Sequence, residues 1–135
     1  MILWSERFAT GSATIDQQHQ MLINSINQLE GMLTSTSPTP EQCRRLIELI
    51  DFLDSYAGMH FKFEEQCMES HRCPAHQQNQ AEHAQFRESI HRFKARQSAE
   101  GFRPEVLKEL YQMSSSWVER HILQVDIQLK PCLKS

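Results

Sequence analysis

The sequence lacks several features that would mark particular classes of protein. Glycine occurs only four times in 135 residues, and no stretch alternates apolar and polar residues as a half-buried β-strand does. No apolar run approaches the ~20 residues that a membrane helix needs, and the first residues do not resemble a signal peptide. The formal net charge of −3 provides no basic surface for nucleic acid. We therefore expect an all-α, cytoplasmic protein without membrane or nucleic-acid partners.

Cysteine is present, but not at the spacing of a metal-binding or redox motif. No two of the four are arranged as CxxC; they are Cys43, Cys67, Cys73 and Cys132. A 135-residue chain that is 39% hydrophobic is long enough to build one sizeable core, so it does not need disulfides for stability. We interpret the cysteines as reduced thiols.

Apolar residues recur at spacings of three and four, which predicts amphipathic helices. The pattern places four helices at about residues 15–35, 40–70, 74–97 and 104–130, after an irregular N-terminal arm of residues 1–14. Thr39 and Gln42 have the spacing of a capping box, with Pro40 at the first helical position. Four such helices with short connections predict one domain over residues 1–135, an antiparallel up-down four-helix bundle.

Polar residues occupy positions on the apolar stripes of these helices. Each stripe contains one histidine: His19, His60, His83 and His121. Glu64 follows His60 by one turn, and Asn79 precedes His83 by one turn, so each pair lies on one helix face. Asp126 follows His121 by five residues, which separates the two by ~140° around an ideal helix. The placement of Asp126 is therefore the weaker geometric argument.

Buried carboxylates are harder to explain than buried histidines. A single core histidine is usually a hydrogen-bonded core residue, and His19 alone would be interpreted so. A buried carboxylate costs several kcal/mol unless a positive charge compensates it, and no lysine or arginine lies on the stripes. A bound metal would supply that charge. Imidazoles and carboxylates without thiolates suit iron, zinc or manganese, and two carboxylates able to bridge favour a pair of irons.

These residues, taken in order, resemble the bacterial hemerythrins over essentially the whole chain. The resemblance rests on Trp4, Gly11, IDQQHQML (15–22), HFKFEE (60–65), AEHAQF (81–86) and HILQVD (121–126). It implies two iron ions joined by an oxo or hydroxo bridge, with dioxygen as the ligand. It implies that His19 and His60 are ligands of one iron, that His83 and His121 are ligands of the other, and that Glu64 and Asp126 bridge them.

One position departs from the family pattern. The family has a histidine four residues before His83, where this chain has Asn79. Asn79 could coordinate iron through its amide oxygen, hold a water on the metal, or leave the position open. Water reaching this iron would speed its autoxidation, which favours sensing over oxygen carriage.

The resemblance therefore implies a non-enzymatic oxygen or redox sensor with no catalytic residues of its own. Members of the family occur both as stand-alone carriers and as input domains of signalling proteins such as diguanylate cyclases, so the resemblance leaves open a fused output domain. It also leaves open nitric oxide in place of dioxygen as the ligand. A stand-alone dioxygen carrier or store is the alternative, followed by a di-iron oxidase or a metal-free structural bundle. An apolar ligand pocket is predicted from residues that would equally suit a plain core: Leu22, Phe63, Phe86, Trp117 and Ile122.

Overall fold

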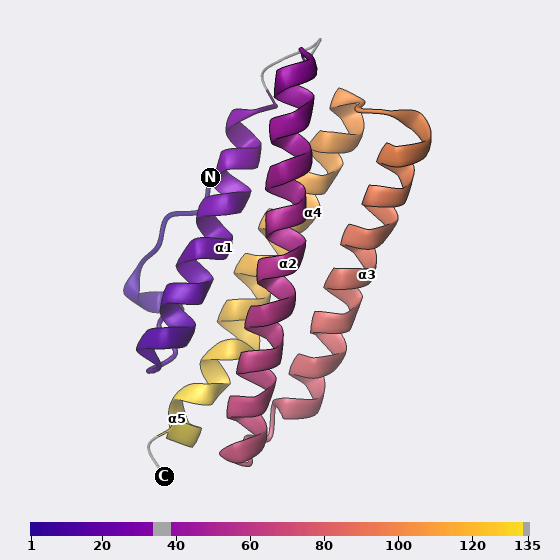
Figure 1. Cartoon of the computed structure of the whole chain (residues 1–135). Helices are drawn as coiled ribbons and strands as arrows, with labels where there is room; N and C mark the ends of the chain where they lie inside the picture. The colour runs from indigo at the N-terminus through magenta and orange to yellow at the C-terminus, as the bar shows by residue number, and fades with distance from the viewer. Residues whose placement is uncertain (34–38, 134–135) are drawn as a thin grey trace.

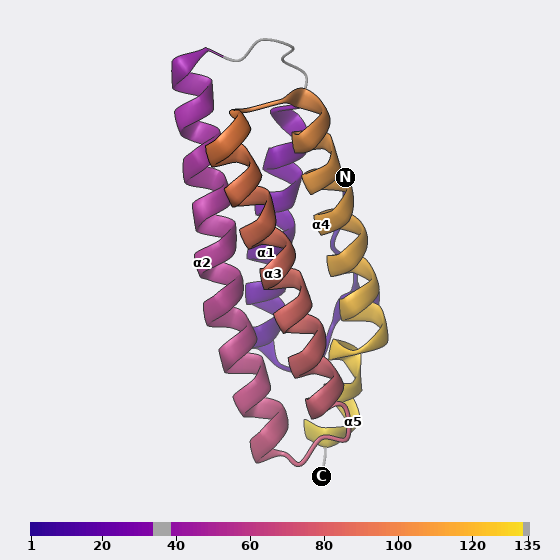
Figure 2. The same ribbon diagram turned by 90° about the vertical axis from the view of Figure 1, so that its right-hand side faces the viewer.

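The structure is a computed structural model that describes residues 1–33 and 39–133. Four long helices lie side by side in it: α1 (Ala13–Gly31), α2 (Pro40–Ser70), α3 (His76–Glu100) and α4 (Pro104–Gln124). Figures 1 and 2 show that consecutive helices run in opposite directions. α1 and α3 each pack against both α2 and α4. Among the described residues no strand occurs, so the predicted all-α up-down bundle is confirmed.

The N-terminal arm is less irregular than predicted. Residues Glu6–Phe8 form a short 3₁₀ helix, η1, and the fully buried Phe8 anchors it. α1 begins at Ala13 rather than near residue 15 because the Ser12 hydroxyl accepts a hydrogen bond from the Ile15 N–H and caps the helix. Its last helical residue is Gly31, and the predicted end at residue 35 lies outside the described residues.

The boundaries of α2 and α3 depend on local capping. Thr39 and Gln42 form the predicted capping box, which is confirmed, with Pro40 at the first helical position. α3 begins at His76, later than the predicted residue 74, because a turn precedes it in which the His76 N–H donates to the Cys73 carbonyl. It continues beyond the predicted residue 97, and its last helical residue is Glu100. Gly101 caps this end with a φ of 77°, a conformation that suits glycine.

The prediction of one continuous helix over residues 104–130 is wrong. α4 ends at Gln124, where Val125 departs from regular helical geometry with φ −115° and ψ −56°. A 3₁₀ turn, η2 (Asp126–Gln128), and a short helix, α5 (Leu129–Leu133), follow. Val125 and Leu129 are buried, so packing fixes the chain on both sides of the break. α5 lies at the same end of the bundle as the turn between α2 and α3 (Figures 1 and 2).

Two apolar clusters fill the bundle. The larger one runs along all four long helices, and the smaller one lies at the α5 end and includes Met68, Val125 and Leu129. The buried polar residues from the four stripes lie between apolar residues of these clusters. Within the described part of the chain, no helix is long and apolar enough to span a lipid bilayer.

Candidate metal centre

The polar residues predicted on the stripes are all buried in the bundle. Exposed fractions are 0% for Glu64 and Asn79, 1% for His19, His60 and Asp126, and 2% for His83 and His121. All four long helices and η2 contribute to this set. The structure therefore brings together every residue that the sequence predicted as a metal ligand.

The break after α4 explains how Asp126 reaches this set. In a continuous helix Asp126 would lie ~140° from His121. With the helix interrupted at Val125, Asp126 begins a 3₁₀ turn instead, and its Oδ1 lies 3.0 Å from His121 Nε2. The weak geometric argument for Asp126 is thus resolved by a change of backbone conformation.

Glu64 is the central carboxylate. Its Oε2 lies 3.1 Å from His19 Nε2 and 3.4 Å from His60 Nε2, and its Oε1 lies 3.3 Å from His83 Nε2. Asp126 Oδ2 lies 3.0 Å from the same His19 Nε2. Glu64 and Asp126 are therefore each shared between histidines of different helices.

The donor atoms form two overlapping groups. One comprises His19, His60, Glu64 and Asp126, and the other comprises Glu64, His83, His121 and Asp126; in each, the ligand atoms lie within 4.8 Å of one another. The two groups have both carboxylates in common. Two cations bridged by two carboxylates, with two imidazoles each, would match this geometry.

Three residues that the sequence analysis missed orient the histidines. Gln18 Oε1 lies 2.6 Å from His60 Nδ1, Glu65 Oε2 lies 3.0 Å from His83 Nδ1, and Glu82 Oε1 lies 2.8 Å from His121 Nδ1. These oxygens can only accept, so each Nδ1 donates and the Nε2 lone pair faces the centre. Gln18 and His60 are 42 residues apart in the chain, and Glu82 and His121 are 39 apart. No local pattern in the sequence signals such pairs.

Asn79 lies within the centre and links two helices. Its Nδ2 donates to Glu64 Oε1 at 2.9 Å and to the Met68 sulfur at 3.2 Å, while its Oδ1 lies 2.7 Å from His121 Nε2. Asn79, on α3, therefore connects Glu64 of α2 with His121 of α4.

Without a bound cation, a protonated histidine balances part of the negative charge of the two carboxylates. Burial tends to lower the pKa of His19, but the hydrogen bonds and charges of Asp126 and Glu64 outweigh it and raise the pKa to about 10. Burial tends to raise the pKa of Glu64, but the close imidazoles of His19, His60 and His83 outweigh it and hold that pKa well below its usual range. The centre thus favours ionised carboxylates with positive charge beside them.

The chemistry of the donors fits a metal ion. His83 Nε2 and Asp126 Oδ1 are buried without a hydrogen-bond partner. Because Glu65 takes the Nδ1 hydrogen of His83, its Nε2 lone pair faces Glu64 Oε1 at 3.3 Å, and two such lone pairs attract only across a proton or a cation. The donors are imidazole nitrogens and carboxylate oxygens without thiolate, which suits iron, zinc or manganese.

Aromatic rings cover one half of the centre. Phe61 stacks on His83 with centroids 3.8 Å apart and planes 7° apart, and Trp117 stacks on His121 at 4.3 Å and 11°. Phe86 lies against Trp117 at 4.5 Å. These rings exclude water from the outer faces of both imidazoles.

The predicted ligand pocket is only partly consistent with this arrangement. Its buried members are Leu22, Phe86, Trp117 and Ile122. The inclusion of Phe63 is wrong, because this side chain is 40% exposed. Neighbouring residues are ~100° apart around a helix, so Phe63 turns away from the face that carries Glu64. Phe61, which the sequence analysis did not select, lies beside the histidines instead.

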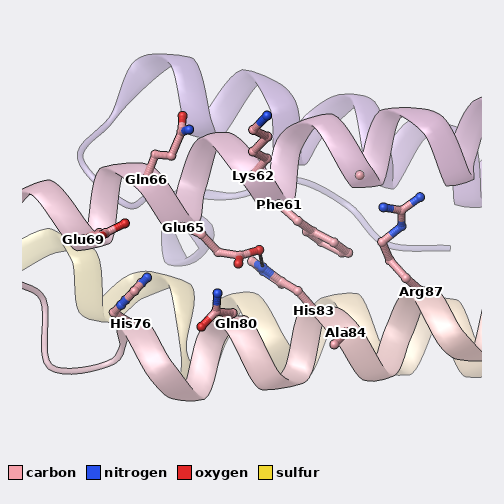
Figure 3. A pocket seen from close by; sticks show the side chains of 11 residues that line it. Phe61, Lys62, Glu65, Gln66, Glu69, His76, Gln80, His83, Ala84 and Arg87 are labelled. Atoms are coloured by element: carbon pink, nitrogen blue, oxygen red, sulfur yellow. Dashed lines mark hydrogen bonds and ion pairs between the residues drawn. The ribbon is translucent and has the colours of Figure 1, made fainter.

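A groove between α2 and α3 approaches the centre from solvent. It has a volume of about 410 Å³ and is lined by residues that include Phe61, Glu65 and His83. Figure 3 shows the Glu65 carboxylate and the His83 ring pointing toward each other across it, with the Phe61 ring alongside. The groove is therefore lined by His83 and its partner Glu65, and the fully buried Glu64 is not among its lining residues.

Comparisons with known proteins agree with this geometry. The hemerythrin HHE cation-binding domain family matches residues 10–133. The chain is 30% identical over 123 residues to a bacteriohemerythrin of Stenotrophomonas maltophilia (strain R551-3), which covers 90% of this chain and 74% of that protein. A crystal structure of wild-type hemerythrin matches with a TM-score of 0.87 at 23% identity, over 100% of this chain and 99% of that one, which shows a common fold.

A cation-binding family that spans the described bundle, and two groups of metal-ligating side chains inside it, lead to one conclusion: the chain belongs to the hemerythrin family and is a bacterial hemerythrin-like domain.

Proposed function

We propose that this chain is a non-haem di-iron domain that binds dioxygen and acts as an oxygen or redox sensor. The observation that carries the di-iron part is the pair of four-residue groups that share Glu64 and Asp126. Two carboxylates common to both groups can bridge two cations, and the nitrogen and oxygen donors suit iron. The relative's name, bacteriohemerythrin, supports the same metal chemistry.

The role of each residue follows from its group. His19 and His60 would hold one iron, and His83 and His121 would hold the other. Glu64 and Asp126 would bridge the two, and an oxo or hydroxo group would complete the link. Gln18, Glu65 and Glu82 would fix the tautomers of three of these histidines through their Nδ1 hydrogen bonds.

A ferrous pair supplies, when bound, the two electrons and the open coordination position that dioxygen requires. The protein supplies the surroundings. The rings of Phe61 and Trp117 shield His83 and His121 from water, and Glu64 and Asp126 place fixed negative charge between the imidazoles. A low-dielectric, water-poor site of this kind strengthens each electrostatic interaction in it.

Asn79 is the reason for preferring a sensor over a carrier. With asparagine at this position, each of the two groups contains two histidines and the same two carboxylates. Both irons would then have an open position for a small ligand, dioxygen or nitric oxide, and Asn79 would hold a water at one of them. Faster oxidation to the diferric state follows, which suits a domain that reports oxygen or redox state. Any enzymatic output, such as that of a diguanylate cyclase, would lie in a fused domain.

The metal assignment is tested by counting iron in purified variants. We expect two irons per chain in the wild type and in His91→Ala, a matched control, because His91 is exposed and pairs with Asp54. His60→Ala removes a proposed ligand and should reduce the iron content. Equal iron in His60→Ala and the wild type, or no iron in either, would contradict the assignment.

The sensor assignment is tested by reducing the iron-loaded protein without oxygen and then admitting air. Visible absorption that passes rapidly to the diferric spectrum supports a sensor. A spectrum that persists for hours and reverses when oxygen is removed supports the alternative, a stand-alone carrier or store. Sustained turnover of ferrous iron or of a phenol would instead identify a di-iron oxidase.

A further inference from the structure

Two cysteines meet at the α5 end of the bundle, outside the metal centre. Cys73 lies in the turn between α2 and α3, and Cys132 lies in α5. Both thiols donate to the same atom, the carbonyl oxygen of Gln128, at 3.4 Å each. Cys73 and Gln128 are 55 residues apart in the sequence, so only the fold brings these sulfur atoms to one point.

The backbone holds Cys73 in this position. Arg72, which precedes it, has a left-handed conformation with φ 53°, and the Cys73 N–H donates to the Met68 carbonyl at 2.8 Å. The Cys73 side chain is 4% exposed, whereas Cys132 is partly exposed. Solvent can thus reach the pair from the Cys132 side.

The two thiols also interact with each other. The pKa of Cys132 is raised to about 11, chiefly by a hydrogen bond with the Cys73 thiol and further by burial and by the charge that Cys73 would carry. Cys67 packs at the edge of the same cluster, and its own hydrogen-bonding neighbour is His71, whose Nδ1 lies 3.8 Å from the Cys67 sulfur. The shared Gln128 carbonyl and the contact between Cys73 and Cys132 place these two sulfur atoms where a bond between them can form. The raised pKa makes the reaction faster in alkaline solution, where more of the thiol is deprotonated.

We propose that Cys73 and Cys132 form a redox-active dithiol that hydrogen peroxide converts to a disulfide. One sulfur, as thiolate, attacks a peroxide oxygen; the O–O bond breaks, and a sulfenic acid and water result once protons are taken up. The second sulfur attacks the first, forms the S–S bond and releases the second water. Two thiols lose two electrons and two protons, and one peroxide becomes two waters.

The disulfide would tie α5 to the α2–α3 turn. Cys73 packs in one apolar cluster with Met68, Val125 and Leu129. Asp126 lies in the chain between Val125 and Leu129, so the link would restrain the segment that carries this carboxylate. This site goes beyond the proposed oxygen sensing, and its existence does not depend on which metal the centre holds.

Disulfide mapping of the full-length protein tests the proposal. The purified, reduced chain is treated with hydrogen peroxide, the remaining thiols are alkylated, and tryptic peptides are analysed by mass spectrometry. Cleavage after Arg72 separates Cys67 from Cys73, so their links are distinguishable. We expect a peptide pair joined through Cys73 and Cys132, with Cys43 and Cys67 alkylated. We also expect slower hydrogen exchange of the amides in residues 126–133 after oxidation.

Matched variants make the result specific. Cys132→Ser and Cys73→Ala should each abolish the link, and Cys43→Ser, at a distant position near the start of α2, should leave it unchanged. The proposal is overturned if four thiols are still alkylated after peroxide treatment. It is equally overturned if Cys67 joins Cys73, if the only links are between chains, or if the cysteines become sulfonic acids without a link.

Discussion

Replacing Glu82 with glutamine should loosen one iron of the pair more than the other. Glu82 Oε1 accepts from His121 Nδ1 at 2.8 Å and is the only described partner of that nitrogen. Its side chain is 26% exposed, so solvent weakens the interaction without abolishing it. His121 belongs to the group that also contains His83, whereas His19 and His60 belong to the other group. The effect should therefore be confined to the His83 and His121 half.

The size of the effect follows from the kind of hydrogen bond that is lost. Glutamine keeps an acceptor oxygen but removes the charge, and a hydrogen bond to a charged group exceeds a neutral one by about 1 kcal/mol. A loss of about 1 kcal/mol corresponds to roughly fivefold weaker binding. Glu65 contacts His83 of the same group at 3.0 Å, so the double variant Glu65→Gln/Glu82→Gln should weaken binding by roughly 30-fold, within the range for residues that orient metal ligands.

The assay is anaerobic competition between the diferrous protein and a chelator specific for ferrous iron. We expect two phases, with the first iron leaving more readily in Glu82→Gln and the second leaving as in the wild type. Glu119→Gln is the matched control on α4, because Glu119 is exposed and pairs with Arg7. Release identical to the wild type, or an equal weakening of both irons, would refute the reasoning that Glu82 acts through His121.

Three further predictions concern the centre and the bundle. Asn79→His should add an imidazole donor, exclude water and slow autoxidation after air is admitted by roughly tenfold, or ~1.4 kcal/mol in the barrier; unchanged or faster decay of the absorption would contradict this. Leu129→Ala removes a fully buried side chain and should lower the free energy of unfolding, measured by urea titration, by ~2–5 kcal/mol. A loss of less than about 1 kcal/mol would show that the α5 end is loosely packed. Burial tends to raise the pKa of Asp54, but the hydrogen bond and charge of Lys94 outweigh it and lower that pKa. This carboxylate therefore stabilises the fold above its unfolded pKa of ~3.9, and the stabilisation is lost as the pH falls through the lower folded value. Asp54→Asn should be less stable than the wild type by about 1 kcal/mol at pH 7 and equally stable at strongly acidic pH, as urea titrations at both pH values would show; a constant difference would refute the assignment.

The four helix stripes were predictable because burial leaves a regular trace in the sequence. Glu64 stands out on such a stripe because a carboxylate there requires compensation, and the structure buries it completely. The bundle follows from the same periodicity, since amphipathic helices with short connections have few other ways to bury their apolar faces.

The remaining features depend on contacts between distant residues. Gln18, Glu65 and Glu82 lie near the edges of their helices' buried faces, where polar residues are ordinary, and only the docking of neighbouring helices gives them histidine partners. The break at Val125 has no proline or glycine to announce it and arises from the packing on both sides. Phe63 and Phe61 are both apolar and two residues apart, so the precise rotation of α2 decides which of them faces the histidines.

Because four helices contribute to the centre, its assembly coincides with completion of the fold. His19 and Glu64 are 45 residues apart in the chain, and Asn79 and His121 are 42 apart. No single helix, and no pair of consecutive helices, contains either complete group of donors. A nascent chain that has not yet released α4 from the ribosome would present isolated histidines and carboxylates with weak affinity for metal. Iron loading would therefore be the last step of maturation, and iron content would report the fraction of molecules that have folded completely.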